Sequence, residues 1–460
     1  MLYRKYAKNI EDFILNQHNK ILLVNGARQI GKSYIIRYVG KRLFKNFVEV
    51  NLKEDSEGDA LFSKVKQTDD LYLLLSSLYG SKLGRKEDTL VFLDEIQSYP
   101  HLLTMLKFLN QEGRYTFIAS GSQLGVALSQ TPSVPLGSIS IEQMYPLDFE
   151  EFLMAMGCGT EVIAAAKDKF NRMEPLSDAL HEYMLKQFKL YLLIGGLPES
   201  VNTFIATRNI ANVRKVHKDI HSLYRIDASQ YDEAHKLVIR RIYDMIPSNL
   251  ENKKKRVIFK NIEDTKGHKQ FTDYVDEFEY LINSGIALSV QAISNPHFPL
   301  SESEKKNLLK LYINDVGLLT CLLYDKNINA VLQDELSINL GTLYESAVAQ
   351  ELIAHGHKLH YYDNNKKGEV DFLVDDFSHL EVLPIEVKSG KDYKVHSALD
   401  NFLSTPLYNI HKAVVFSNEQ NVFTEGGITY MPIYYAMFVS SDIQDEELII
   451  PDIPLPTISM

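Results

Sequence analysis

Apolar and polar positions alternate along the amino-terminal part of the chain in a way that predicts strands and helices in turn. Residues 21–24 form a short continuous apolar run, which is typical of a strand buried on both faces. Further strands are predicted at 47–52, 89–96, 115–120 and 139–147, with helices at 1–19, 34–39, 69–79, 101–110 and 148–156. Strands that alternate with helices in this way indicate a parallel α/β sheet.

The pattern changes after this first unit. Residues 157–235 are mostly helical, with a clear break at 195–198 (GGLP). Residues 236–335 predict a helix, a basic loop, a helix and a strand at 286–290, an order that resembles a winged helix, followed by a helix at 308–323. The remainder predicts helices at 343–354 and 397–404 and strands at 357–362, 370–374, 383–387 and 412–417. We therefore expect four units, namely 1–156, 157–235, 236–335 and 336–460.

Composition restricts the class of protein. The 460 residues are 45% apolar and 24% charged, which is ordinary for a soluble globular chain. The net charge of −11 excludes a polycation, so any nucleic-acid site has to be a local basic patch. Cys158 and Cys321 lie far apart without metal-ligand spacing, which fits a reducing compartment. Neither a signal-peptide core nor a membrane-spanning run is found, so we expect a cytoplasmic protein without membrane contact.

The first predicted strand leads into a glycine-rich segment at 26–33, GARQIGKS, which fits the phosphate-binding pattern G-x-x-x-x-G-K-[ST]. Its two glycines let backbone N–H groups turn toward phosphate oxygens, and the following helix adds partial positive charge. Lys32 would reach the β- and γ-phosphates, and the Ser33 hydroxyl would hold Mg²⁺. A chance match in a surface turn is the alternative, which the strand–loop–helix context disfavours. The expected nucleotide-binding residues of this loop are Gly26, Ala27, Arg28, Gln29, Ile30, Gly31, Lys32 and Ser33.

Two acids, Asp94 and Glu95, end another apolar strand, at the edge of an open sheet where ligands bind. Asp94 is expected to contribute to the nucleotide site by holding Mg²⁺, and Glu95 to polarise the attacking water as general base. Ser120 and Ser122 end the next strand, where one of these hydroxyls could contact the γ-phosphate. A capped turn explains either serine equally well.

A second candidate site lies in the carboxyl-terminal unit. Glu386 and Lys388 form Glu-x-Lys on a predicted strand, so both side chains share one face, and Asp371 on the neighbouring strand can meet them. Two carboxylates and a lysine at a sheet edge can hold Mg²⁺ and orient a water toward a phosphodiester, with Lys388 stabilising the hydroxide. Glu345 on the preceding helix is a further candidate metal ligand. A solvated polar strand face is the alternative, and such folds also host roles other than nuclease activity.

The most basic stretch of the chain falls in the third unit. It could contact nucleic-acid phosphates, although a solvated loop explains it equally well. Its members are Lys253, Lys254, Lys255 and Arg256, with Lys260, Lys266 and Lys269 nearby.

Taken together, these motifs resemble a large prokaryotic family of AAA-type ATPases whose carboxyl-terminal domain, of unknown function, is related to the PD-(D/E)XK nucleases. The resemblance runs from about Tyr6 to Ser417. It implies that the loop residues with Asp94 and Glu95 form an ATP site, and that Glu345, Asp371, Glu386 and Lys388 form the PD-(D/E)XK site. The motifs are VNGARQIGKS (24–33), VFLDEIQ (91–97), IASGS (118–122), YPLDFEEFL (145–153), GGLPE (195–199), IPSNLENKKK (246–255), KLYINDVGLL (310–319), GEVDFLV (368–374) and PIEVKSG (384–390).

One position departs from this family. Relatives usually carry Arg or Lys after the glycine before the last core strand, whereas Ser138 follows Gly137 here. AAA-type ATPases need a cation near the γ-phosphate. Arg28, Arg114, Arg225 or an arginine from a second subunit are the candidates, the last implying a homo-oligomer. A slow or switch-like ATPase becomes more plausible for this chain.

Two functions compete on this evidence. The first is an ATP-binding and ATP-hydrolysing AAA-type protein with a nuclease-like domain that binds or cleaves DNA or another nucleic acid. The second is a regulator without catalysis, in which ATP sets the domain arrangement, the winged-helix-like region binds DNA or protein, and the carboxyl-terminal fold is a scaffold. The acids Asp371 and Glu386 with Lys388 favour the first, and the acidic net charge and Ser138 favour the second.

Overall fold

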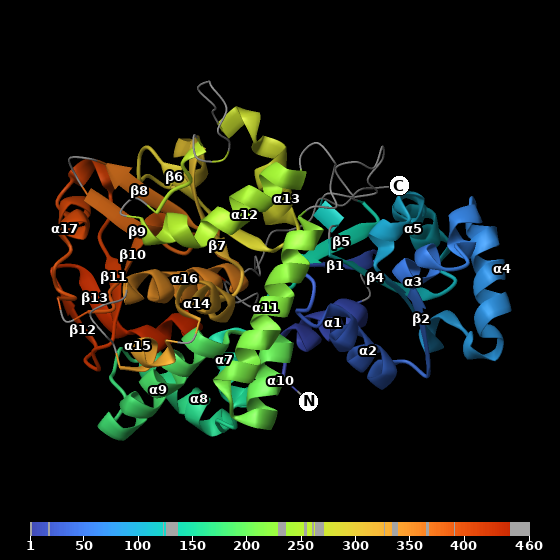
Figure 1. Ribbon diagram of the computed structural model, residues 1–460, viewed down its shortest axis with the longest axis horizontal. Coiled ribbons are helices and arrows are strands. Elements are labelled where there is room, and N and C mark those ends of the chain that lie inside the picture. Colours follow the sequence, from blue (N-terminus) through green and yellow to red (C-terminus); the bar gives the residue numbers. More distant parts are fainter. Residues whose placement is uncertain are drawn as a thin grey trace, which may run out of the picture.

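Two sheets, joined by a layer of helices, make up the molecule (Figure 1). The computed structural model describes residues 2–16, 19–122, 124–125, 137–228, 236–252, 255–259, 262, 271–325, 327–333, 339–364, 368–390 and 392–441. The amino-terminal sheet lies on one side of the molecule and the carboxyl-terminal sheet on the other, with the long helix α11 (Ile210–Asp227) between them (Figure 1).

The amino-terminal sheet has five parallel strands in the order β2-β3-β4-β1-β5, which confirms the predicted parallel α/β core. Helices α1 (Tyr6–Leu15) and α2 (Lys32–Leu43) cover one face, and α4 (Thr68–Tyr79) and α5 (Pro100–Glu112) cover the other. The strands are β1 (Ile21–Asn25), β2 (Asn46–Asn51), β3 (Thr89–Asp94), β4 (Thr116–Gly121) and β5 (Ile139–Gln143).

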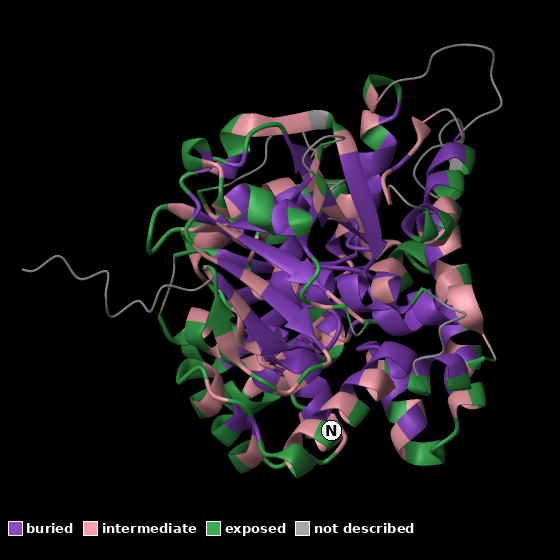
Figure 2. Ribbon diagram, turned by 90° about the vertical axis from the view of Figure 1, so that its left-hand side faces the viewer, coloured by how far each residue is buried: buried purple, intermediate pink, exposed green. Residues whose placement is uncertain are grey.

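The continuous apolar runs of these strands are explained by burial on both faces. Leu22 and Val24 face the core that contains α1 and α2, whereas Ile21 and Leu23 face the core that contains α4 and α5. Successive side chains of a strand point to opposite faces, so a strand between two helical layers needs apolar residues at every position. Figure 2 shows the strands of the molecule buried and the exposed residues on the outer helices and loops.

The middle of the chain is helical, as the pattern predicts. Gly195, with a φ of 73°, ends α9, and Pro198 begins α10, so the predicted break separates these two helices. The helices are α7 (Phe149–Ala155), α8 (Thr160–Asn171), α9 (Asp178–Ile194), α10 (Pro198–Thr207), α11, α12 (Lys236–Glu251), α13 (Val275–Asn283), α14 (Val316–Tyr324) and α15 (Ile328–Leu332).

The second sheet is mixed and has eight strands in the order β12-β13-β11-β10-β9-β8-β6-β7. Helix α16 (Leu340–Ala354) packs on one face and α17 (Ser397–Leu403) on the other. Because β6 and β7 precede residue 336, this sheet runs across the predicted boundary at 335/336. The strands are β6 (Ala287–Ile293), β7 (Glu304–Ile313), β8 (His360–Asn364), β9 (Gly368–Asp376), β10 (Glu381–Val387), β11 (Ala413–Ser417), β12 (Phe423–Glu425) and β13 (Ile428–Pro432).

The prediction of a helix at 308–323 was wrong for residues 308–313. Residues up to Ile313 belong to β7, which pairs antiparallel with β6 in a register that places Ile313 opposite Ala287. Helix α14 begins only at Val316, after Asp315 accepts a hydrogen bond from the Leu318 amide as N-cap. Strand pairing over a long sequence distance overrides the local helical pattern here.

Asp315 also joins α14 to the break between α9 and α10. Its carboxylate accepts the Gly196 amide at 2.6 Å and the Leu318 amide at 2.9 Å, and it is fully buried. Burial raises the pKa of Asp315 to about 6, while the backbone N–H groups that donate to it oppose the shift. Gly317 lies directly against the backbone of Ile194 and Gly195. Two of the sequence motifs, GGLPE and KLYINDVGLL, therefore pack against each other.

Most of the predicted basic stretch cannot be placed in this fold. Lys253, Lys254, Lys260, Lys266 and Lys269 lie outside the described residues. Lys255 and Arg256 are described; Lys255 pairs with Glu345 on α16, and Arg256 pairs with Asp363 on β8. Across the described part of the chain, none of the helices combines the length and apolarity that a bilayer crossing requires.

The first testable prediction concerns this packing. A Cβ added at Gly317 would lie 2.4 Å from the backbone of Ile194 and Gly195, which cannot move aside easily. We expect Gly317→Ala to lower the free energy of unfolding by about 1–3 kcal/mol, the usual cost of overpacking. Gly390→Ala is the control, because nothing lies within 4 Å of a Cβ at that position. Urea unfolding followed by circular dichroism measures both, and equal midpoints would contradict the tight packing.

Candidate functional site

The phosphate loop follows β1 and leads into α2, in the strand–loop–helix order that the motif requires. Gly26 and Gly31 have φ values of 147° and 93°, which other residues rarely adopt, and Gln29 also has a positive φ of 66°. A Cβ on Gly26 would lie 2.5 Å from the carbonyl oxygen of Met144. Position 26 therefore requires glycine, both because of its positive φ and because a side chain would clash with the Met144 carbonyl oxygen.

Lys32 begins α2 and is almost completely buried. Its ammonium donates to the carbonyl oxygens of Gly26 and Ala27, both at 2.8 Å, so it spans the loop. Burial lowers the pKa of Lys32 to about 8, and the nearby carboxylates of Glu95 and Asp94 oppose this shift. Phosphate oxygens would replace the two carbonyls as better partners for this charge.

Asp94 ends β3 and lies beside the start of α2. Ser120, at the end of β4, donates a very short hydrogen bond to Asp94, and Ser33 also donates to it. Burial raises the pKa of Asp94, and the two hydroxyl donors oppose the shift. The parallel strands β3 and β4 end at the same edge, which explains why residues so distant in sequence meet.

Glu95 follows β3 with a φ of 55°, a left-handed turn that redirects the chain into a short 3₁₀ segment. Its carboxylate accepts a short hydrogen bond from the Gln97 amide and a second, at 3.3 Å, from the Ser122 hydroxyl. The two serines of the predicted site thus have different partners, because Ser120 contacts the candidate metal ligand Asp94 and Ser122 contacts the candidate base Glu95. Gln97 was not identified as a site residue from the sequence.

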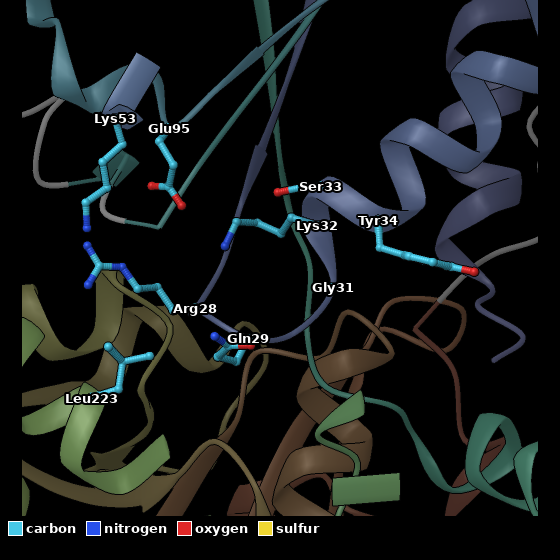
Figure 3. A pocket seen from close by; sticks show the side chains of 9 residues that line it. All are labelled: Arg28, Gln29, Gly31, Lys32, Ser33, Tyr34, Lys53, Glu95 and Leu223. Carbon is cyan, nitrogen blue, oxygen red and sulfur yellow. The ribbon is translucent and has the colours of Figure 1, made fainter. Parts of the chain in front are cut away.

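A cavity of about 400 Å³ opens over the loop (Figure 3). It brings together Lys32, Ser33 and Glu95, three of the residues predicted from the motifs. Lys53, from α3 (Leu52–Glu57), also lines this cavity and a second one of about 510 Å³ that adjoins Asp94 and Glu95. The sequence alone did not identify Lys53, because it has no motif around it and only the pairing of β2 with β3 places it at this edge.

The other side of the cavity is formed by the helical half of the chain. Arg28 of the loop forms a short ion pair with Asp227, the last residue of α11, and Leu223 of the same helix lines the cavity (Figure 3). The Tyr224 hydroxyl donates to the Arg28 carbonyl oxygen at 3.1 Å. Burial raises the pKa of Asp227 to about 6, and Arg28 opposes the shift.

A second contact with this half lies at the start of the loop. Asn25 donates from its side-chain amide to the carbonyl oxygen of Asn283 at 3.1 Å and to Gln143 at 2.7 Å. A Cβ on Gly285 would lie 3.0 Å from the backbone nitrogen of Ala27, so the turn after α13 touches the loop backbone. Both contacts come from segments that the sequence did not connect with nucleotide binding.

The structure excludes two of the predicted sources of a cation for this site within the chain. Arg114 precedes β4, at the opposite edge of the sheet, and stacks over the Tyr72 ring at 4.4 Å. Arg225 pairs with Asp244 of α12 at 3.0 Å. Neither residue lines the cavity, whereas Arg28 does.

Position 138, like Arg114, lies at the amino-terminal ends of the parallel strands, far from the phosphate loop. The Ser138 carbonyl oxygen accepts the amide of Ile21, the first residue of β1, at 2.9 Å. The phosphate loop begins at the other end of this five-residue strand, roughly 16 Å away. A cation at this position would not reach the nucleotide site of its own chain.

In the second sheet, the structure brings Asp371 and Glu386 together. β9 and β10 pair antiparallel with Phe372 opposite Ile385, a register that places Asp371 opposite Glu386. The Asp371 carboxylate accepts the Val387 amide at 2.9 Å. The pKa of Asp371 is raised well above its usual value by burial and by the negative charge of Glu386. Lys388 donates to Glu386 at 2.7 Å, so all three residues share one face.

Glu345 has a different environment from the one predicted. This buried carboxylate forms a short ion pair with Lys255, a second contact with Lys310 at 3.4 Å, and a short hydrogen bond from Tyr312. The two ammonium groups lower the pKa of Glu345 despite its burial. Lys310 also pairs with Glu369 at 2.7 Å. Lys310 and Tyr312 were missed because the sequence pattern placed them on a helix.

Of the predicted metal set, Asp371 and Glu386 lie together, and the charge of Glu345 also helps to raise the pKa of Asp371. Lys255 and Lys310 pair with the Glu345 carboxylate. In the described part of the chain, a different group, Asp376, His379 and Glu381, is the one in which three or more ligand atoms lie within 4.8 Å of one another. Lys412 pairs with both acids of that group, at 2.8 Å and 3.0 Å. That group is a surface ion-pair cluster at the turn between β9 and β10.

Solved structures resemble this chain only distantly. A Walker-type ATPase of Pyrococcus abyssi is 14% identical, with a TM-score of 0.41, and the match covers 70% of this chain and 96% of that one. Cdc6p of Pyrobaculum aerophilum is 13% identical, with a TM-score of 0.26 and coverage of 72% and 94%. The RuvB Holliday junction branch migration motor of Thermotoga maritima is 14% identical, with a TM-score of 0.28 and coverage of 67% and 92%. Likenesses this weak say nothing of what this chain binds.

Family models match three successive segments of the chain. Residues 340–436 match a domain of unknown function, DUF4143, and residues 185–329 match another, DUF8612. No protein of curated function matches the chain. Residues 18–153, which hold the phosphate loop, Asp94, Glu95 and the parallel sheet, match the model of an AAA domain. The amino-terminal part of this chain is thus an AAA-type P-loop domain, followed by two segments whose families have no assigned function.

Proposed function

We propose that the protein binds ATP with Mg²⁺ and hydrolyses ATP at the carboxyl edge of its parallel sheet. The observation that carries this proposal is the meeting of Lys32, Ser33, Asp94 and Glu95, from two separate segments, around two adjoining cavities that share Lys53 and Glu95. A buried ammonium, a hydroxyl, a carboxylate suited to Mg²⁺ and a second carboxylate at one sheet edge are the groups that phosphoryl transfer requires.

Each of these residues has a definite task in the proposed reaction. Lys32 leaves the carbonyl oxygens of Gly26 and Ala27 and binds the β- and γ-phosphates. Ser33 and Asp94 supply hard oxygen atoms, the donor set that Mg²⁺ prefers, and they already share a hydrogen bond. When bound, Mg²⁺ would neutralise the charge of the phosphates. Glu95, beside the cavity, orients the attacking water and accepts its proton.

A second candidate function concerns the second sheet. The pairing of Asp371 with Glu386, with Lys388 beside them, supports a site for a nucleic-acid phosphate, and for its metal-dependent cleavage as in PD-(D/E)XK nucleases. The alternative is a scaffold that ATP rearranges. The ion pairs of Glu345 with Lys255 and Lys310 favour that alternative, because they remove a carboxylate from the metal set.

The first prediction from this site is that Lys32→Ala weakens the binding of ATP and Mg²⁺. A charge-assisted hydrogen bond is worth about 1.5–3 kcal/mol, so the affinity should fall roughly 10- to 100-fold. Lys41→Ala, in the last turn of the same helix, removes an exposed lysine and should leave the affinity unchanged. Isothermal calorimetry measures both, and tight binding of ATP by Lys32→Ala would refute the nucleotide site.

Hydrolysis has a separate test in Glu95→Gln. This variant keeps the shape of the side chain and the metal acid Asp94, but it cannot accept a proton. We expect ATP affinity to change less than threefold while turnover falls by about 10²-fold or more, in line with the loss of a general base. Phosphate release measures turnover. Hydrolysis at the wild-type rate would show that Glu95 is not the base.

The second sheet is tested by metal binding. Mn²⁺ should bind weakly to the wild-type protein, and the Asp371→Ala variant should lose this binding together with any nicking of DNA. Asp371→Asn, which retains an acceptor for the Val387 amide, separates the loss of charge from the loss of that hydrogen bond. Asp392→Ala removes an exposed acid nearby as the control. Titration by electron paramagnetic resonance that shows equal binding in all variants would rule out this site.

A further inference from the structure

A γ-phosphoryl group in transfer carries negative charge on its outer oxygens, and nucleotide hydrolases of this class place a cation there in addition to the loop lysine and Mg²⁺. Position 138 cannot provide that cation within the chain, and Arg114 and Arg225 lie away from the cavity. We propose that Lys53 provides it, from the same chain, and is a catalytic residue. This inference rests on the proposed ATP hydrolysis.

The sheet topology brings Lys53 to the reacting edge. β2 lies next to β3, and their register places Asn51 opposite Asp94. Asn51 then ends the strand and caps α3 by accepting the Glu54 amide at 3.1 Å. Lys53 lies in the first turn of that capped helix, two residues beyond the partner of Asp94. Its backbone position is thus set by the same strand ends that position the two acids.

The side chain of Lys53 turns toward the nucleotide cavity. It lines that cavity together with Lys32 and Glu95, and it also lines the adjoining cavity with Asp94 and Glu95. Figure 3 shows its ammonium group extending toward the guanidinium of Arg28, beside the Glu95 carboxylate. Lys53 is also one of the positive charges that hold down the pKa of Asp227, which burial raises.

Lys53 is the least committed of the cations around this cavity. Lys32 belongs to the loop, and Arg28 is held by its short, buried ion pair with Asp227. The ion pair of Lys53 with Glu57 is 3.9 Å long, and the two side chains are 40% and 70% exposed. Such an exposed pair contributes almost nothing to stability. Lys53 can therefore leave Glu57 for a phosphate without a significant loss.

In the proposed step, a water oxygen bonds to the γ-phosphorus while the bond from that phosphorus to the β–γ bridging oxygen breaks. ADP leaves with the electron pair, and Glu95 takes the proton of the water. Lys53 forms and breaks no covalent bond. It places its positive charge against the γ-phosphoryl oxygens, where charge must be stabilised during transfer.

The test uses the full chain and the variants Lys53→Ala and Lys53→Arg, with Lys64→Ala as a control at an exposed lysine of the same domain. Two quantities are measured, the kcat of ATP hydrolysis and the affinity for ADP with Mg²⁺, by calorimetry, in the presence and absence of aluminium fluoride. Aluminium fluoride with ADP imitates the phosphoryl group in transfer, so it reports on this charge independently of turnover.

We expect Lys53→Ala to lower kcat at least tenfold and to lose most of the gain in ADP affinity that aluminium fluoride gives, while the affinity for ADP alone changes less than threefold. Lys53→Arg should recover much of both losses, and Lys64→Ala should equal the wild type.

A wild-type kcat and a wild-type response to aluminium fluoride in Lys53→Ala would overturn the inference and leave the ATPase proposal intact. Loss of affinity for ADP alone would also overturn it, because it would indicate a structural role. A wild-type protein that binds ATP but does not hydrolyse it, or fails to bind it, would refute the proposed function and this inference with it.

Discussion

Arg28 carries a permanent positive charge into a nearly closed part of the molecule, and Asp227 balances it. The two side chains are only 15% and 6% exposed, so neither charge could remain there without the other. One partner belongs to the phosphate loop and the other ends α11, the helix that lies between the two sheets (Figure 1). The Tyr224 and Tyr280 hydroxyls, which donate to the backbone of Arg28 and Asp227, hold the same junction. The arrangement of the two halves therefore depends on the conformation of the loop.

Further contacts connect the phosphate loop with the middle helices and with the second sheet. Gly285 touches the loop backbone, and Asn314 donates to the Gly285 carbonyl oxygen at 2.9 Å. Asp315, the next residue, binds the turn between α9 and α10. One continuous apolar core runs from α2 through the middle helices to α16 and the second sheet. A phosphate group that drew Arg28 from Asp227 would leave a buried acid whose pKa is already raised to about 6, and the helical half would have to compensate.

In and beside the second sheet, buried charges are compensated by protonation or by ion pairs. Asp371 and Glu386 face each other, so one of them is driven toward its protonated form. Glu345, in contrast, is held ionised by Lys255 and Lys310. A fully buried lysine such as Lys310 is stable only because Glu345 and Glu369 surround it. The charges of these buried acids and lysines are thus largely balanced within the chain.

The sequence by itself determined the phosphate loop, the strands around it and the acids at their ends. Gly26, Gly31 and Lys32 act within one short segment whose spacing carries the chemistry, and the apolar runs of a sheet buried on both faces are visible without a partner. Asp371 and Glu386 could also be paired in advance, because alternation along two neighbouring strands allows few registers. Tertiary structure alone decided that residues 308–313, predicted as the start of a helix, belong to β7 and pair with β6. It also decided that Lys53 and Glu95 line the same cavity, and that Asp227 forms an ion pair with Arg28. The ion pairs of Lys255 and Lys310 with Glu345 are likewise set by the tertiary structure. These contacts join residues far apart in the chain, and long-range pairing leaves no period or spacing in the sequence from which it could be predicted.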